Sequence, residues 1–235
     1  MQGSTPTPIV LGICGSERPG GNTDLALEYA GRLVRERGAE FRTVHLREHR
    51  ISPCSPCGDC NQRTTPCELR DDMPAIVEQM KQADAIVYAT PVHGFGPAHL
   101  MQIFIERAGV GFLRFDRPLA NKVGGIIVVS RRYSDAAVHS QLVDNLLLNR
   151  MILVGSGFPA LLRNTSPQPQ LQDAEGLEAL ERMLHRMIDM TQLLRRNQTA
   201  DGRPVLPVDD RNERVSRATR VVLPGQRTSS EKQVS

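Results

Sequence analysis

Residues 8–14 read PIVLGIC, and residues 15–23 continue the chain with GSERPGGNT. The first stretch is short, apolar and rich in β-branched side chains, which predicts a fully buried parallel strand. The second stretch is a glycine-rich loop, and the apolar side chains that follow it recur at helical spacing up to Gly38. Asn22 and Thr23 offer a helix cap at the end of the loop. A strand, a glycine-rich loop and a helix in this order predict the first unit of an α/β fold.

Strands and helices continue to alternate along the chain. We expect further strands at residues 41–46, 83–90, 122–130 and 151–155, with helices at residues 75–82, 98–108 and 135–148. Residues 91–96 are predicted to be a loop. A long amphipathic helix follows, with an apolar stripe of Leu177, Leu180, Leu184, Met187, Ile188 and Leu194. This alternation predicts a parallel sheet covered by helices on both faces.

Composition limits the function classes. The chain has 235 residues, a net charge of +3 and 4% aromatic side chains, so it lacks the basic bias and the stacking side chains of a nucleic-acid binder. No apolar run is long enough to cross a bilayer, and residues 1–8 are too polar for a signal peptide, so we expect no membrane partner and a cytoplasmic protein. We expect one domain over residues 1–197, with a cysteine-rich insertion at 52–73, and a flexible tail at 198–235.

The loop at residues 15–23 has the features of an anion site. It joins a buried strand to a helix, where free N–H groups and the positive end of the helix dipole point outward. Ser16, Asn22 and Thr23 add hydrogen-bond donors, and Arg18 can make a bidentate contact to phosphate. The spacing is neither that of a P-loop nor that of a dinucleotide fingerprint, so a monophosphate is expected. The alternative is a turn that merely needs glycines.

Four of the five cysteines fall within a short segment, with the spacing C-x2-C-x2-C-x6-C: Cys54, Cys57, Cys60 and Cys67. Thiolates at two-residue gaps can hold three corners of a cubane cluster, and a more distant thiolate closes it, so these are candidate [4Fe–4S] ligands. Tetrahedral zinc usually takes cysteines as two separated pairs. Zinc and metal-free cysteines remain the alternatives. Cys14, on the first predicted strand, is expected to be a small buried side chain.

Several motifs in a fixed order resemble the NADPH-dependent FMN reductase family, and specifically its iron–sulfur flavoprotein branch. The motifs are Gly15-Ser16-x-Arg18-x-x-Gly21-Asn22-Thr23, the cysteine segment, Asp71-Asp72-Met73, Pro91-Val92-His93-Gly94 and FIERAG at residues 104–109. The resemblance covers roughly residues 8–160. It implies a flavodoxin-like doubly wound sheet of five parallel strands in the order 2-1-3-4-5, with FMN where the strand order reverses.

The resemblance also implies roles for individual residues. Ser16, Arg18, Asn22 and Thr23 would hold the FMN phosphate. Pro91, Val92, His93 and Gly94 would lie along the flavin ring, with Ser130 and Arg131 on its other side. This loop departs from the family pattern at His93, Gly94, Phe95, Pro97, Ala98 and Gln102, which affects the surface that would face a substrate.

Together these features predict an FMN-dependent oxidoreductase that takes hydride from NADPH or NADH. Electrons would pass to a quinone, another small aromatic acceptor, a redox protein or the iron–sulfur cluster. No catalytic side chain is required, and His93 is the one candidate, the alternative being a loop histidine bonded to backbone. Arg131 and Arg132 would either place positive charge near the reduced flavin or be solvated. The rival hypotheses are a non-enzymatic electron carrier and a zinc-stabilised module without flavin. The resemblance implies a homodimer or homotetramer.

Overall fold

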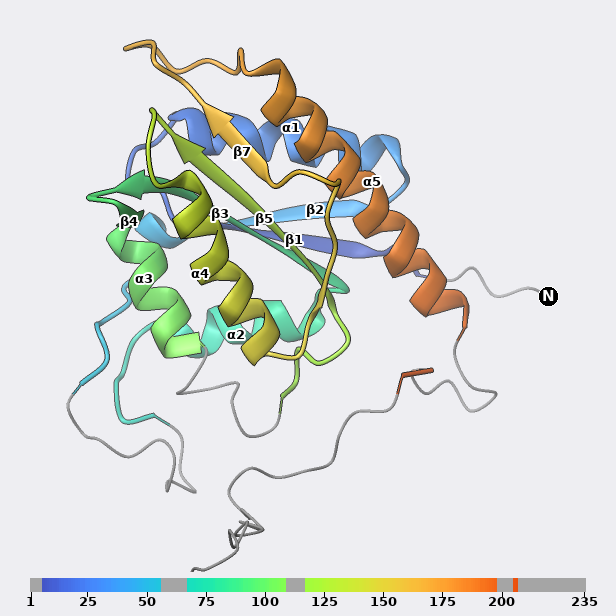
Figure 1. Ribbon diagram of the computed structural model, residues 1–235. Helices are drawn as coiled ribbons and strands as arrows, with labels where there is room; N and C mark the ends of the chain where they lie inside the picture. The colour runs from blue at the N-terminus through green and yellow to red at the C-terminus, as the bar shows by residue number, and fades with distance from the viewer. Residues whose placement is uncertain (1–5, 56–66, 109–116, 198–204, 207–235) are drawn as a thin grey trace, which may run out of the picture.

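The computed structural model describes residues 6–55, 67–108, 117–197 and 205–206. A twisted sheet of parallel strands runs through the centre of the molecule (Figure 1). Its main strands lie in the order β2-β1-β3-β5-β6, so that counted along the chain the second strand is outermost, next to the first. This is the predicted flavodoxin-like order. The bounds of these strands are β1 Ile9–Cys14, β2 Glu40–His45, β3 Ala85–His93, β5 Val123–Ser130 and β6 Ile152–Leu153.

Two short strands were not predicted. The chain at residues 91–96 is a tight hairpin and not a loop, because β3 continues to His93 and pairs antiparallel with β4 (Gly96–Pro97). The fifth position in the sheet is shared by two strands: β6, which is what forms of the strand expected at residues 151–155, pairs with the beginning of β5, and β7 (Ala160–Arg163) pairs with its end. Gly155, Gly157 and Pro159 lie between the two pieces, where they favour a turn over a continuous strand.

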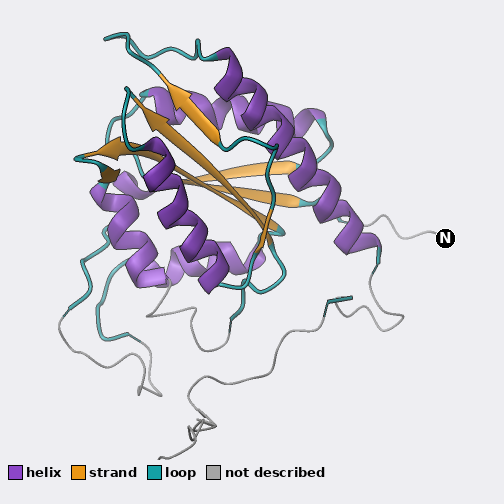
Figure 2. Cartoon of the chain, viewed as in Figure 1, coloured by secondary structure: helices purple, strands orange, loops and turns teal. Residues whose placement is uncertain are grey.

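Helices cover both faces of the sheet, as predicted (Figure 2). One face carries α1 (Asn22–Glu36) and α5 (Ala174–Arg196). The other carries α2 (Met73–Gln82), α3 (His99–Glu106) and α4 (Asp135–Leu148). A single turn of 3-10 helix, η1 (Leu46–Glu48), follows β2. Within the described residues, no helix combines the length and the apolar character needed to cross a membrane.

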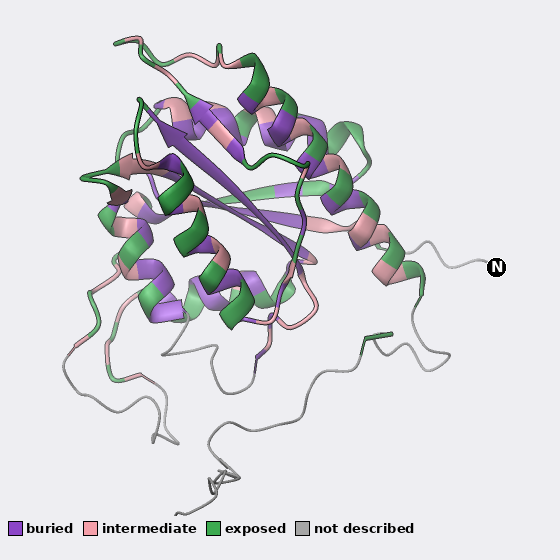
Figure 3. Ribbon diagram, in the orientation of Figure 1, coloured by how far each residue is buried: buried purple, intermediate pink, exposed green. Residues whose placement is uncertain are grey.

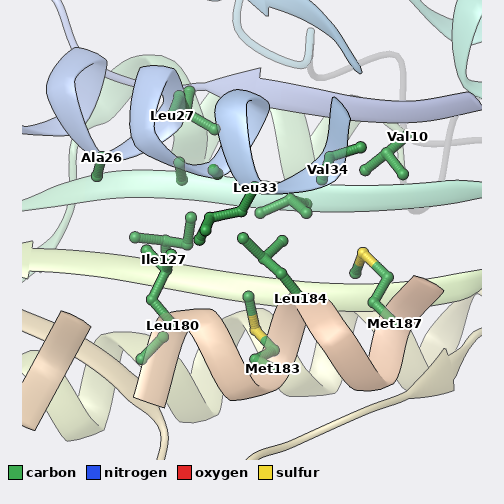
Figure 4. Packing of buried hydrophobic residues seen from close by; sticks show 14 of the residues in the cluster. Val10, Ala26, Leu27, Leu33, Val34, Ile127, Leu180, Met183, Leu184 and Met187 are labelled. Atoms are coloured by element: carbon green, nitrogen blue, oxygen red, sulfur yellow. The ribbon is translucent and has the colours of Figure 1, made fainter. Parts of the chain in front are cut away.

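The strands alternate their side chains between two apolar cores. On β3, Ala85, Val87 and Ala89 pack toward α1 and α5, whereas Ile86 and Tyr88 pack toward α2, α3 and α4. Figure 4 shows the first core, where side chains of α1 and α5 pack together against the same face of the sheet. The central strands are buried over almost their whole length (Figure 3). Burial on both faces explains why these strands read as continuous apolar runs in the sequence.

Candidate functional site

The loop after β1 is shaped by close backbone approaches. The Gly15 N–H donates to the carbonyl oxygen of Ala89 at 2.8 Å. A Cβ at Gly15 would lie only 2.7 Å from the Cβ of Met101, so no other residue fits there without a shift of the chain. Further along, Gly20 has a φ of +66°, which glycine adopts without steric cost. Two of the glycines that predicted this loop are therefore required by its geometry.

The first turn of α1 faces outward with no side-chain cap among the described residues. The N-cap is Gly21, so the prediction of Asn22 or Thr23 at this position was wrong. The Asn22 Oδ1 atom instead accepts a hydrogen bond of 2.8 Å from the backbone N–H of Gln170. Arg18 is exposed beside this turn, and Thr23 is buried in it. An uncapped helix N-terminus beside an arginine is a favourable site for an anion.

One pocket of about 440 Å³ opens above this loop. It is formed at the ends of β1, β3 and β5, where the strand order reverses and ligands of open α/β sheets usually bind. Nine of the ten predicted FMN-binding residues line it: Ser16, Arg18, Asn22, Thr23, Pro91, Val92, His93, Ser130 and Arg131. The tenth, Gly94, lies in a neighbouring pocket.

A wall of this pocket was missed by the sequence reasoning. Five residues of one segment line it: Asn164, Ser166, Pro167, Gln168 and Pro169. The position of this segment is fixed at both ends, since Asn164 N donates to the Ser130 carbonyl at 3.0 Å and the N–H of the following Gln170 donates to Asn22. The only signal was a local rise in Ser, Pro and Gln after β7, which by itself indicates a loop but not a binding surface.

The second pocket, of about 450 Å³, shares Val92 and Arg131 with the first. Its remaining lining residues are Gly94, Phe95, Arg132 and Tyr133. Phe95 is 75% exposed and Tyr133 is 64% exposed, which is unusual for aromatic side chains of this size. The site therefore continues from a polar end at the helix N-terminus to an aromatic end flanked by arginines.

The hairpin between β3 and β4 holds Phe95 in a strained conformation. Gly94 and Phe95 are its two central residues, and their φ angles of +55° and +68° are those of a type I′ turn. Glycine suits such a turn, but a bulky aromatic side chain seldom adopts a positive φ. Strain of this kind is common at binding sites, where it fixes the direction of a side chain.

Two predicted site residues, Ser130 and His93, each lie beside an acidic side chain. The Ser130 hydroxyl donates to Asp135 Oδ2 at 3.2 Å, and Arg163 Nε donates to the same oxygen at 2.7 Å. Burial alone would raise the pKa of Asp135, but Arg163 and the hydrogen bonds around the carboxylate bring the pKa below its ordinary value. His93 Nδ1 lies 4.0 Å from Glu17 Oε1. Both residues line the first pocket.

Glu17 was not predicted as a site residue. Its Oε1 atom lies 2.6 Å from His99 Nδ1, so it joins the anion loop to the beginning of α3. Glu17 also lines the first pocket. It is a negative charge beside a loop built for an anion, and its contact with His99 directs it toward α3.

The four predicted cluster ligands are only partly described. Cys54 is exposed and Cys67 is half-buried, whereas Cys57 and Cys60 lie outside the described residues. The predicted tail at 198–235 also lies outside them, apart from residues 205–206. The Sγ atom of Cys67 lies 3.8 Å from Arg107 Nη2. The guanidinium is therefore placed to donate a hydrogen bond to this sulfur.

A parallel sheet of this order, with a glycine-rich anion loop after its first strand, defines a flavodoxin-like protein. A family model described as NADPH-dependent FMN reductase matches residues 8–164. The chain belongs to this family.

Relatives agree with this assignment, and solved structures share the fold. An iron–sulfur flavoprotein from Methanosarcina thermophila is 32% identical over 193 residues, which cover 80% of this chain and 97% of the relative. One from Methanocaldococcus jannaschii is 34% identical over 152 residues, 64% of this chain and 77% of the relative. Among solved structures, RosB with a bound flavin-phosphate intermediate has a TM-score of 0.63 at 18% identity and 81% coverage of both chains. FerB, an NAD(P)H:acceptor oxidoreductase from Paracoccus denitrificans, has a TM-score of 0.58 at 14% identity, covering 80% of this chain and 98% of FerB. These two structures show that the fold is shared.

Proposed function

We propose that this protein is an FMN-dependent NAD(P)H oxidoreductase that reduces a small aromatic acceptor, such as a quinone. The observation that carries the proposal is the continuity of the two pockets. An anion loop lies at one end and an aromatic, arginine-flanked hollow at the other, and FMN has a phosphate at one end and a planar ring system at the other.

In this proposal each part of the site has a separate task. Ser16, Arg18 and the first turn of α1 hold the FMN phosphate through N–H groups and positive charge. Val92 and Phe95 border the ring from the β3–β4 hairpin, and Arg131 borders it from the end of β5. Bound FMN supplies hydride acceptance from the nicotinamide and electron release to the acceptor. The arginine side chains favour the extra negative charge that the reduced site carries.

The cysteine segment supports a second electron acceptor within the protein. We propose that Cys54, Cys57, Cys60 and Cys67 hold a [4Fe–4S] cluster, consistent with the names of the archaeal relatives. Two members of this set, Cys54 and Cys67, are described, and the Cys67 sulfur accepts a hydrogen bond from the buried Arg107 guanidinium, as ligands of metal centres often do from neighbouring groups. The cluster also supports the alternative that the protein is an FMN and iron–sulfur electron carrier without steady-state turnover.

The first experiment is a visible spectrum of protein purified without oxygen, followed by steady-state oxidation of NADPH and NADH with a quinone acceptor. Flavin bands together with a broad cluster shoulder, and turnover with either nicotinamide, are the expected results. Protein without flavin would overturn the proposal. Flavin and cluster without turnover would favour the electron carrier. Analytical ultracentrifugation of the same sample tests the proposed homodimer or homotetramer.

A further inference from the structure

Among the residues that the structure describes, the largest fully buried side chain is that of Arg107, which is charged and not apolar. It directly follows α3, as the residue that caps the C-terminus of this helix. Its Nη1 and Nη2 atoms lie 2.6 Å from Asp71 Oδ2 and 3.2 Å from Asp71 Oδ1, and the exposed fractions of the two side chains are 1% and 0%. A buried ion pair adds little net stability compared with apolar packing, because both charges lose their hydration. Its presence here therefore needs a reason other than stability.

The ion pair holds together the two ends of the cysteine segment. Arg107 Nη1 donates to the Ser52 carbonyl at 2.6 Å, and Asp71 Oδ2 accepts from the Ser52 N–H at 3.0 Å. Both backbone groups of Ser52 are thus bound by one ion pair. Asp72 adds a second closure, because its carboxylate accepts from the N–H of Arg50 at 2.8 Å and its own N–H donates to the Arg50 carbonyl at 3.0 Å. The segment that carries the four cysteines therefore leaves and rejoins the domain at one fixed point.

The same guanidinium also reaches one of the candidate ligands. Arg107 Nη2 lies 3.8 Å from Cys67 Sγ, on the side of the guanidinium that also bonds Asp71 Oδ1. A positive donor beside a ligating sulfur stabilises the added negative charge of a reduced cluster, and so raises its reduction potential.

We propose that Arg107 is the positioning residue of the iron–sulfur centre: it closes the cysteine segment through Ser52 and Asp71 and donates to the Cys67 sulfur. This inference rests on the cluster proposed above. It assigns to Arg107 control over the retention of the cluster and over its reduction potential. The inference concerns the cluster and not FMN, because the contacts on which it rests, with Ser52, Asp71 and Cys67, lie on the cysteine segment.

The test uses full-length protein with two variants. Arg107→Lys keeps the charge, but a single ammonium cannot reach Ser52, Asp71 and Cys67 together. The double variant Arg107→Gln with Asp71→Asn removes both charges, so that neither is left buried and unpaired. The matched control is Arg42→Gln with Glu40→Gln, which neutralises an exposed arginine–carboxylate pair on β2.

The readouts are iron and acid-labile sulfide per chain, FMN per chain, and the midpoint potential of the cluster. The potential comes from a redox titration followed by EPR. We expect both Arg107 variants to lose iron and sulfide while keeping FMN. We expect the cluster that remains in the double variant to have a more negative midpoint potential, with the control equal to wild type. Wild-type protein that holds no iron after anaerobic reconstitution would overturn the cluster and this inference together. Iron in the wild type, with unchanged iron content and potential in both variants, would overturn the role of Arg107 alone.

Discussion

Asp24 and Arg47 form a two-point ion pair directly beneath the anion loop. Arg47 Nη1 lies 3.0 Å from Asp24 Oδ1, and Arg47 Nη2 lies 3.0 Å from Asp24 Oδ2. Asp24 belongs to the first turn of α1, and its Oδ2 atom also accepts from the Gly20 N–H at 2.8 Å. Burial acts to raise the pKa of Asp24, but Arg47 and the other donors lower it overall, so the carboxylate stays charged at neutral pH. Arg47 offsets a negative charge that would otherwise repel a bound phosphate.

The same pair argues against a metal ion at this point. Cys14, Asp24 and His45 have potential ligand atoms within 4.8 Å of one another. Both oxygens of Asp24 are already bound by Arg47, however, and the Cys14 thiol donates to Asp24 Oδ1 at 3.2 Å. A cation there would have to displace a guanidinium. The group is better explained as the support of the anion loop.

Arg47→Met tests this support. Without the guanidinium, the Asp24 charge faces the phosphate site and the Ser16 carbonyl loses its contact with Arg47 Nη1. We expect FMN affinity to fall by about 1.5–3 kcal/mol, which is about 10- to 150-fold. Fluorescence titration of the flavin-free protein with FMN measures this change.

Two further variants separate charge from packing. Adding Asp24→Asn to Arg47→Met should recover most of the affinity, because no negative charge then remains beneath the loop. Arg42→Met, on β2 but exposed, should leave FMN binding at the wild-type value. Equal losses in the single and double variants would show that Arg47 acts through packing and not through charge.

Arg18→Ala tests the proposed phosphate contact itself. Arg18 lines the first pocket and is exposed toward it, so its removal should weaken FMN binding by about 1.5–3 kcal/mol, the range for hydrogen bonds to charged groups. Arg18→Lys keeps the charge but loses the bidentate fork, and we expect an intermediate loss. Unchanged affinity in Arg18→Ala would remove this residue from the phosphate site.

The parts of the site that the sequence predicted are those that lie next to a strand end. Ser16 follows β1, Pro91 lies in β3 and Ser130 ends β5, so buried strands in the sequence mark their positions in space. The segment at residues 164–169 follows β7, which is short and lacks β-branched side chains, so neither the strand nor the wall after it could be inferred. Arg47 was missed because its role depends on a tertiary contact with Asp24 across 23 residues of chain.

Cys14 predicts a loss of stability in alkaline solution. Burial, more than its other interactions, raises the pKa of this thiol to about 12, from an ordinary value near 9.0. In the unfolded chain the thiol loses its proton at a lower pH, so between these values the folded state binds more protons and stability falls as pH rises. The slope is at most about 1.4 kcal/mol per pH unit from this one group.

Urea unfolding of the wild type and Cys14→Ala at pH 8, 9 and 10 measures this effect. The variant should be less stable at pH 8, since a buried sulfur is removed, but its stability should fall less steeply above pH 9. Cys54→Ala, at an exposed position, serves as the control and should keep the wild-type slope. Parallel pH curves for wild type and Cys14→Ala would contradict the raised pKa.

Substitution of a proposed cluster ligand should remove iron and sulfide but not FMN. Cys60→Ser should lower iron and acid-labile sulfide together while FMN stays bound, because the anion loop belongs to a different part of the chain. Iron and sulfide assays on anaerobically purified protein should give close to four of each per wild-type chain, as expected for a [4Fe–4S] cluster. Cys14→Ser is the matched control, since Cys14 lies on β1 and should not affect the iron content. Wild-type protein with full flavin and almost no iron would leave a plain FMN reductase.

The strained conformation of Phe95 predicts that its substitution will raise stability and weaken binding of the acceptor. Its φ of +68° costs about 1–2 kcal/mol for a residue with a Cβ, whereas asparagine tolerates this conformation better. Because Phe95 is mostly exposed, Phe95→Asn sacrifices little packing and should raise the free energy of unfolding by about 1 kcal/mol. The same change removes an aromatic face from the second pocket, so KM for a quinone acceptor should rise.

Tyr133→Asn is the matched control. It removes the other exposed aromatic side chain of that pocket from a position without a positive φ, so KM should rise with no gain in stability. Urea denaturation and steady-state kinetics on both variants decide the point, and a Phe95→Asn protein with wild-type KM would show that the hairpin strain serves no binding role.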